Sequence, residues 1–141
     1  MDDVLTENRR VKLDVGDYTA EYSNGERCPI YFERKGLGDL FGTMGKGYAR
    51  FKREMELAKK LNVRLILAIE GTSADVVEGF PHTSMSGLSI LRKLQTLWLR
   101  YDLPHLFFPT RVAMAQYIAE FFKQFGYNYL RTQKKARHER A

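Results

Sequence analysis

The chain has 141 residues, of which 44% are hydrophobic and 13% are aromatic. That length suits one hydrophobic core and is short for two domains, so we expect a single domain. No stretch approaches the roughly 18 consecutive apolar residues of a membrane-spanning helix, and the opening MDDVLTENRR lacks the apolar segment of a secretory signal. The composition excludes a disordered chain and predicts a soluble protein with no membrane partner.

The net charge is +6 and much of the excess lies at the C-terminal end. We divide the chain into one domain over residues 1–130 and a basic tail over 131–141, which suits either a nucleic-acid contact or a solvated helix end. Cys28, the single cysteine, cannot form an internal disulfide and favours a reducing, cytoplasmic setting. The cations of the tail are Arg131, Lys134, Lys135, Arg137 and Arg140.

The first elements in chain order are predicted to be strands. Residues 11–15 (VKLDV) alternate between apolar and polar side chains, as a half-buried strand does, and Gly16 marks a bend after them. Two further alternating segments flank SNGER, which contains Asn24 and Gly25, and this arrangement predicts a hairpin. The chain therefore opens with a small antiparallel unit.

Helices and strands then alternate. Residues 48–61 have helical spacing, with Phe51, Met55 and Ala58 on one stripe, and residues 63–69 (VRLILAI) form an apolar run typical of a strand buried on both faces. That strand should be central in the sheet. Residues 73–86 are predicted to be a loop.

The last part of the chain is predicted to contain a helix, a strand and a helix. The first of these helices covers residues 88–101, Pro104 ends it, and residues 105–108 (HLFF) form a short strand. Thr110 is placed to cap the final helix and Gly126 to end it. The fold class that follows is α/β, a mixed β-sheet flanked by helices. The expected apolar faces are Leu88, Leu91, Leu94, Trp98 and Tyr101 on the first helix, and Met114, Tyr117, Ile118, Phe121 and Phe125 on the second.

The register of the hairpin follows from burial. A three-residue loop, Asn24-Gly25-Glu26, pairs residues whose numbers sum to 50 and makes one face uniformly apolar, whereas a two-residue loop does not. The favoured register sets Tyr18 opposite Phe32 and, on the other face, Asp17 opposite Glu33, with Cβ atoms roughly 5 Å apart. The expected apolar pairs are Tyr18 with Phe32, Ala20 with Ile30 and Tyr22 with Cys28.

Side chains two apart on a strand share a face, so Lys35 joins Glu33 and Asp17 while Arg34 points to the opposite face. Two carboxylates at this distance repel each other unless a cation lies between them. Hard oxygen ligands suit Mg²⁺ or Mn²⁺, which would activate water and stabilise a phosphorane, with Lys35 orienting or deprotonating the water or neutralising the transition state. The other interpretation, a surface ion cluster neutralised by Lys35 alone, stays open.

Asp39 follows Lys35 by four residues. It could complete the metal shell directly or through water, or it could be the N-cap of a helix that starts at Leu40, and both roles are compatible. The nearby GTMGKG and GLG segments lack residues that phosphate-binding glycine motifs require, so neither an ATP site nor a dinucleotide site is expected.

Written together, Gly16-Asp17, Glu33-Arg34-Lys35 and Asp39 resemble the GD…ERKxxxD signature of the XPF family nuclease domain. The resemblance covers residues 11–126. It implies a restriction-endonuclease-like fold, a divalent-metal-dependent endonuclease that acts on DNA, possible branched or structured substrates, and metal ligands at Asp17, Glu33 and Asp39.

The resemblance also suggests which cations contact DNA. Arg34 matches a functionally important arginine of the family, although from this sequence it could equally pair with another element, for instance Glu70. Lys46 and Arg50 are further candidates for phosphate contacts, with an ordinary solvated position as the alternative for Arg50.

Two further expectations come from comparison with the family pattern. The last two helices form a dimer interface in the family, which makes Phe121, Phe122 and Phe125 candidates for a homodimer or heterodimer contact. The usual first strand, which ends in a metal-binding acid, has no counterpart in residues 1–10. Either Asp2, Asp3 or Glu7 substitutes for that acid, another chain completes the sheet, or the chain is an N-terminally shortened form. The alternative function is therefore a catalytically weak or inactive nuclease-like module that binds DNA or pairs with an active partner.

Overall fold

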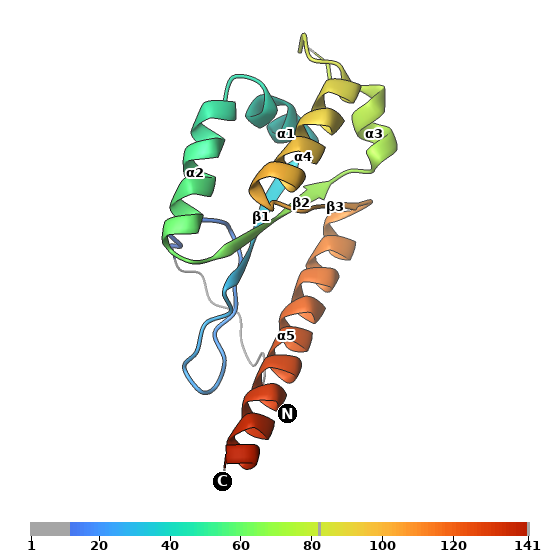
Figure 1. Ribbon diagram of the computed structural model, residues 1–141. Helices are drawn as coiled ribbons and strands as arrows, with labels where there is room; N and C mark the ends of the chain where they lie inside the picture. Colours follow the sequence, from blue (N-terminus) through green and yellow to red (C-terminus); the bar gives the residue numbers. More distant parts are fainter. Residues whose placement is uncertain (1–11, 82, 141) are drawn as a thin grey trace.

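The computed structural model describes the backbone of residues 12–81 and 83–140 and the side chains of residues 12–81 and 83–129. Strands and helices alternate along most of the chain (Figure 1). In order they are β1 (Ile30–Gly36), α1 (Leu37–Met44), α2 (Tyr48–Lys60), β2 (Arg64–Glu70), α3 (Ser73–Glu78), α4 (Gly87–Tyr101), β3 (His105–Phe108) and α5 (Arg111–Arg140).

The three strands form one parallel sheet in the order β1-β2-β3. β2 is central, as its apolar run predicted, and its last residue, Glu70, pairs with Gly36 of β1 and Phe108 of β3. The three strands therefore end at the same edge of the sheet. β3 has four residues and lies at the side of the sheet away from β1.

The expected α/β class is confirmed: the sheet is flanked by helices on both faces. The antiparallel part is smaller than expected, because residues 12–15 form no strand and pairing is limited to isolated bridges, Tyr18 with Phe32 and Glu21 with Arg27. Asp17 N and Tyr18 N both donate to Phe32 O. Two donors on one carbonyl end the ladder there, so residues 12–15 leave the strand direction.

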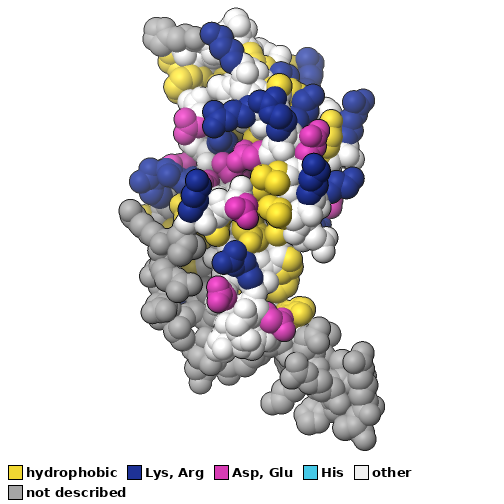
Figure 2. Space-filling model, turned by 90° about the vertical axis from the view of Figure 1, so that its left-hand side faces the viewer, with side chains coloured by type: hydrophobic (Ala, Val, Ile, Leu, Met, Phe, Trp, Pro, Cys, Tyr) yellow, Lys and Arg dark blue, Asp and Glu magenta, His cyan; other side chains and the backbone are white. Residues whose placement is uncertain are grey.

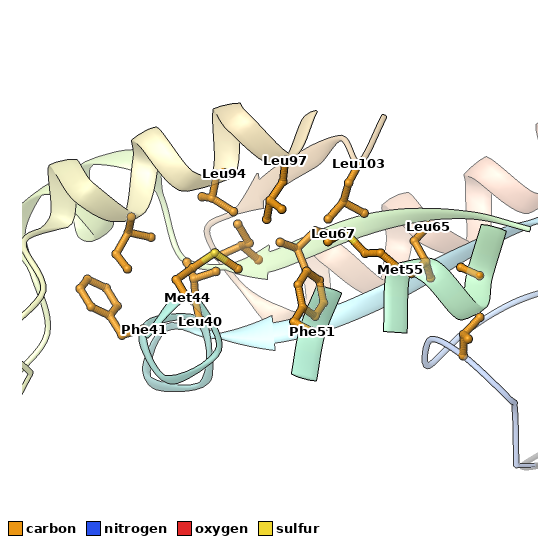
Figure 3. Packing of buried hydrophobic residues seen from close by; sticks show 14 of the residues in the cluster. Leu40, Phe41, Met44, Phe51, Met55, Leu65, Leu67, Leu94, Leu97 and Leu103 are labelled. Carbon is orange, nitrogen blue, oxygen red and sulfur yellow. The ribbon is translucent and has the colours of Figure 1, made fainter. Parts of the chain in front are cut away.

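One face of the sheet carries the larger core, under α1, α2 and α4. Leu67 and Ile69 of β2 point into it with no exposed surface, and Figure 3 shows Leu67 between the α4 side chains and those of α1 and α2. The stripe predicted for α2 is buried as expected. The principal residues of this core are Tyr31, Leu40, Phe41, Met44, Phe51, Met55, Ala58, Leu65, Leu67, Ile69, Val76, Ile90, Leu94, Leu97 and Leu103.

The opposite face is covered by α5 and by the segment that precedes β1. Phe32 is fully buried there and contacts the rings of Phe121 and Phe122 edge-on at 5.2 and 5.5 Å. Phe122, expected at a dimer interface, is thus part of this protein's own core, and Phe121 and Phe125 pack against it. The buried residues of this face are Ala20, Tyr22, Cys28, Phe32, Ala68, Phe108, Met114, Ile118 and Phe122.

Two predictions for residues 73–101 were wrong. Residues Ser73–Glu78 form α3 rather than a loop, because Thr72 and Asp75 make a reciprocal capping box at its start. α4 has the expected length but buries a different face, Ile90, Leu94 and Leu97. Of the face that was predicted, Leu94 is buried, Leu91 is partly buried, and Leu88, Trp98 and Tyr101 are 44–50% exposed.

α5 begins as predicted, with the Thr110 hydroxyl accepting a hydrogen bond from Ala113 N at 3.1 Å, but it does not end at Gly126. Phe125 and Tyr129 stack at 5.5 Å across that position and Tyr127 packs on the core, so apolar contacts continue the helix past the glycine. Residues 131–140 of the basic tail are its last turns, and residue 141 lies outside the described residues. Tyr117, predicted on the buried face, is 44% exposed.

None of the described helices is both long enough and apolar enough to cross a membrane.

α4 starts in direct contact with α3, which generates a test of the fold. A Cβ on Gly87 would lie 1.9 Å from the Val76 carbonyl oxygen, so Gly87→Ala should lower the free energy of unfolding by about 3 kcal/mol or more. Urea unfolding followed by circular dichroism measures this loss. Gly42→Ala is the matched control, because no atom lies within 4 Å of its added Cβ and alanine favours a helix by up to about 1 kcal/mol. Equal stability of the two variants would contradict the packing.

Candidate active site

Each strand is followed closely by a helix, so helix N-termini gather at the edge where the strands end (Figure 1). α1 begins directly after β1, α3 begins at Ser73 after β2 ends at Glu70, and α5 begins at Arg111 after β3 ends at Phe108. In open parallel sheets ligands bind outside the carboxyl ends of the strands, and helix N-termini favour anions. The side chains at this edge are therefore the first candidates for a functional site.

Gly16 brings the chain against β1 just before the site. Its φ is +70°, and an added Cβ would lie 3.2 Å from Tyr31 Cβ and 3.3 Å from Leu65 Cδ2. Any other residue would be strained and crowded here. The glycine therefore allows the following residue, Asp17, to lie along the edge of β1.

Asp17 is held by two hydrogen bonds to β1. Its backbone N donates to Phe32 O at 2.8 Å, and its Oδ2 accepts from Arg34 N at 2.7 Å. The Tyr18–Phe32 bridge has the predicted register. Asp17 lies just before that bridge, and its negative charge acts on Glu33 of β1. The carboxylate is exposed but fixed in position.

Nearer the hairpin tip the register differs from the prediction. Glu21 pairs with Arg27, and Tyr22 N donates to Glu26 O. The predicted pairs of Ala20 with Ile30 and Tyr22 with Cys28 therefore do not form.

The register changes at Pro29, which lacks an N–H, so the strand bulges there. The Thr19 hydroxyl spans the bulge, within 3.1 Å of Cys28 O and 3.2 Å of Ile30 O. The apolar face is nevertheless shared by Ala20, Tyr22, Cys28 and Phe32, while Tyr18 is 42% exposed.

Glu33 and Lys35 lie on one face of β1, as strand alternation predicted. Glu33 is only 7% exposed, the one buried charged residue among those described, and its Oε1 lies 3.5 Å from Lys35 Nζ. Lys35 also lies over the ring of Phe51, 5.9 Å from the centroid. The structure therefore brings Asp17, Glu33 and Lys35 together.

The environment of Glu33 opposes its ionisation. The pKa of Glu33 is raised from 4.5 to about 7, mainly by burial and also by the negative charges of Asp17 and Glu54, and Lys35 only partly offsets these effects. Glu54, on α2, was missed in the sequence. Its spacing of three residues from Phe51 was the available signal, because such residues are neighbours on a helix.

Arg34 lies on the opposite face of β1 and pairs with Glu70, the partner suggested as its alternative. Arg34 Nη2 is 2.9 Å from Glu70 Oε2, and Arg111 Nε is 3.7 Å from Glu70 Oε1. Arg111 had not been singled out in the sequence. Its place just after a predicted strand was the signal, since the ends of parallel strands meet at one edge.

The remaining predicted residues are more peripheral. Asp39 is exposed in the first turn of α1, whose N-cap is Gly36 rather than Asp39, because the helix starts three residues earlier than expected. Lys46 is exposed in the segment between α1 and α2, and Arg50 is exposed on α2. Figure 2, which shows the left-hand side of the molecule in Figure 1, has Lys and Arg side chains gathered over its upper part. Within the described residues, no three His, Cys, Asp or Glu side chains are grouped closely enough to hold a metal ion.

The pair of Asp17 and Glu33 matches what a hard cation needs. Two carboxylates repel each other here, and a divalent ion would relieve that repulsion better than Lys35 does. Mg²⁺ commonly binds through one or two carboxylates and keeps several waters, so two protein ligands suffice in principle. Asp17 and Glu33 therefore supply oxygen donors of the type that Mg²⁺ and Mn²⁺ prefer.

Comparison with known proteins supports the fold. No family model and no curated protein matches the sequence. Among solved structures, XPF from Aeropyrum pernix superposes with a TM-score of 0.57 over 91% of this chain at 14% identity. The chain spans 56% of the length of that structure. The fold is XPF-like.

Glu33 should make stability depend on pH. The Glu33 carboxyl group holds its proton more tightly in the folded protein than in the unfolded chain, because its pKa is raised from 4.5 to about 7. The contribution of Glu33 to the free energy of unfolding therefore falls as the pH rises through this range. The full loss is about 3 kcal/mol. Glu33→Gln removes the ionisation, so without divalent ions it should match the wild type near pH 4.5 and be more stable at pH 8.

Urea unfolding in EDTA across this pH range provides the measurement. Glu56→Gln, the same substitution at an exposed position of α2, is the control and should keep the wild-type pH dependence. A parallel pH profile for Glu33→Gln and the wild type would show that Glu33 ionises freely.

Proposed function

We propose that this protein is a divalent-metal-dependent endonuclease that hydrolyses phosphodiester bonds of DNA. The observation that carries the proposal is the nearly buried carboxylate of Glu33, placed beside Asp17 and Lys35 on an XPF-like fold. Burial of a charged group without full compensation costs free energy and is typical of functional sites. An exposed ion cluster that serves only stability would not require that cost.

The proposed ligands of Mg²⁺ or Mn²⁺ are Asp17 and Glu33, with Asp39 contributing through water from the first turn of α1. The ion supplies Lewis acidity and a more acidic bound water. Lys35, held beside Glu33, orients or deprotonates the attacking water or neutralises the charge that develops on the phosphate. Arg34, on the other side of the strand, contacts the phosphate backbone.

DNA is the proposed substrate because the protein has a net charge of +6, and Lys and Arg side chains gather over part of its surface (Figure 2). Lys46 and Arg50 are proposed to bind backbone phosphates, a contact that positions DNA without reading its sequence. Branched or structured DNA is included among the candidate substrates.

A second function is supported by a separate observation. No third acidic side chain joins Asp17 and Glu33 in a metal-holding group within the described part of the chain. A nuclease-like module with weak or no activity, which binds DNA or pairs with an active partner, would tolerate that arrangement. Cleavage assays separate the two functions.

Loss of either carboxylate should remove cleavage and spare folding. With Mg²⁺ or Mn²⁺ and supercoiled plasmid or branched DNA, we expect the wild type to nick, and Asp17→Asn and Glu33→Gln to be slower by roughly 100-fold or more, since a metal ligand or its charge is lost. Gel assays of nicked product measure the rates. Glu56→Gln should retain the wild-type rate.

Metal binding provides an independent readout. Mn²⁺ should raise the melting temperature of the wild type at pH 8 and have little effect on Asp17→Asn, because a ligand that binds the folded state stabilises it. A wild type that binds DNA but cuts no substrate would favour the inactive module. Equal cutting by the wild type and Glu33→Gln would place the site elsewhere.

We also propose that copies of this chain, or this chain and a related partner, associate through α4 and α5. Leu99 on α4 is 84% exposed and Val112 on α5 is 66% exposed, so both side chains are available for a contact with another molecule. Leu99→Ser should shift the mass measured by light scattering from dimer toward monomer. Leu57→Ser, at a 40% exposed position on α2, should not. A monomeric wild type would contradict self-association.

A further inference from the structure

On the face of the sheet away from Glu33 and Lys35, two guanidinium groups share one carboxylate. Glu70 uses Oε2 for Arg34, at 2.9 Å, and Oε1 for Arg111, at 3.7 Å. Both carboxylate oxygens are thus occupied, and the three residues together retain a charge of one positive unit. The cluster lies at the end of β2, where β1 ends beside it and α5 begins.

The cluster keeps donors available. A guanidinium has five N–H donors in a planar fork, more than the single carboxylate can satisfy for two arginines. Arg34 Nε is buried and has no hydrogen-bond partner, and the Arg111 side chain is 69% exposed. A purely structural ion network would pair its charges and bury them, whereas this one leaves an exposed cation beside an unsatisfied donor.

We propose that Arg111 and Arg34, anchored on Glu70, form a phosphate-binding site for the DNA backbone on the second face of the sheet. This inference rests on the proposed action on DNA and adds Arg111 as a residue that positions the strand. Paired guanidinium groups suit phosphate because their forked donors match its oxygens in a bidentate geometry.

The position of Arg34 in β1 explains how one DNA backbone could contact residues on both faces of the sheet. Arg34 lies between Glu33 and Lys35 in β1, and alternate residues of a strand point to opposite faces. Glu70 pairs with Gly36, the last residue of β1, so the guanidinium pair lies at the carboxyl edge that also carries the carboxylates. A strand of DNA that crosses this edge would contact the carboxylates on one side and the arginines on the other.

The test is equilibrium binding of a fluorescently labelled DNA duplex in EDTA, where no cleavage occurs, at several salt concentrations. Arg111→Gln should weaken binding by about 10-fold at low salt, as the loss of a charged hydrogen bond does. It should also reduce the slope of log affinity against log salt by about one phosphate contact. Arg111→Lys should restore the slope, because the charge returns, but only part of the affinity, because the fork does not.

The matched control is Lys123→Gln, which removes the same charge from an exposed position farther along α5 and should leave both quantities nearly unchanged. Melting temperatures confirm that each variant is folded. The phosphate site would be overturned if Arg111→Gln bound DNA with the affinity and salt slope of the wild type. If Glu33→Gln abolished nicking in the same preparation series, the proposed cleavage would still stand. Weaker DNA binding by Arg111→Gln, together with equal nicking by the wild type and Glu33→Gln, would support the phosphate site and overturn the proposed catalytic site.

Discussion

The burial of the Glu33 carboxylate is the constraint on which the rest of the site depends. β1 lies at the side of the sheet, yet α1 and α2 cover the face to which Glu33 points, so the carboxylate loses most of its contact with water. Asp17 and Glu54 add negative charge and Lys35 alone opposes them, which keeps the pKa of Glu33 near 7. Gly16 contributes by letting the chain approach β1 closely enough to fix Asp17 beside the strand. Together these features leave Glu33 with a charge that its surroundings compensate only in part, the property on which the proposed metal site rests.

The elements that sequence reasoning predicted well are those whose pattern depends on neighbours in the chain. Residues 105–108 were expected as a strand and form β3, and the buried stripe of α2 was identified because polar residues surround it. The predicted bridge of Tyr18 with Phe32 is present, even though the register differs at the hairpin tip near Pro29. α4 was oriented wrongly because LSILRKLQTLWLRY has apolar residues around the whole helix, and only packing against the sheet selects Ile90 and Leu97.

The part of the site that sequence could not provide is assembled from distant elements. Glu54 acts on Glu33 of β1 because α2 packs on one face of the sheet, and Arg111 pairs with Glu70 of β2 because α5 begins just after β3. The order of the strands decides which residues meet at the edge of the sheet where the strands end. That order places β2 in the centre, where both of its faces are buried, and no local sequence motif specifies it. The two faces of β1 consequently serve different charges: carboxylates and a lysine on one, and guanidinium groups on the other. A single strand thus separates groups suited to a cation from groups suited to an anion.

β3 has a consequence for how the protein behaves at high concentration. Like β1, it is an edge strand of the sheet, and edge strands offer unpaired backbone groups to which another molecule can add a strand. Here the strand is limited to four residues, and Pro104 and Pro109, which have no N–H to donate, stand directly before and after it. The exposed edge is too short to template a long ladder between molecules. The two prolines beside β3 therefore limit how far a strand from another molecule could pair with this edge of the sheet.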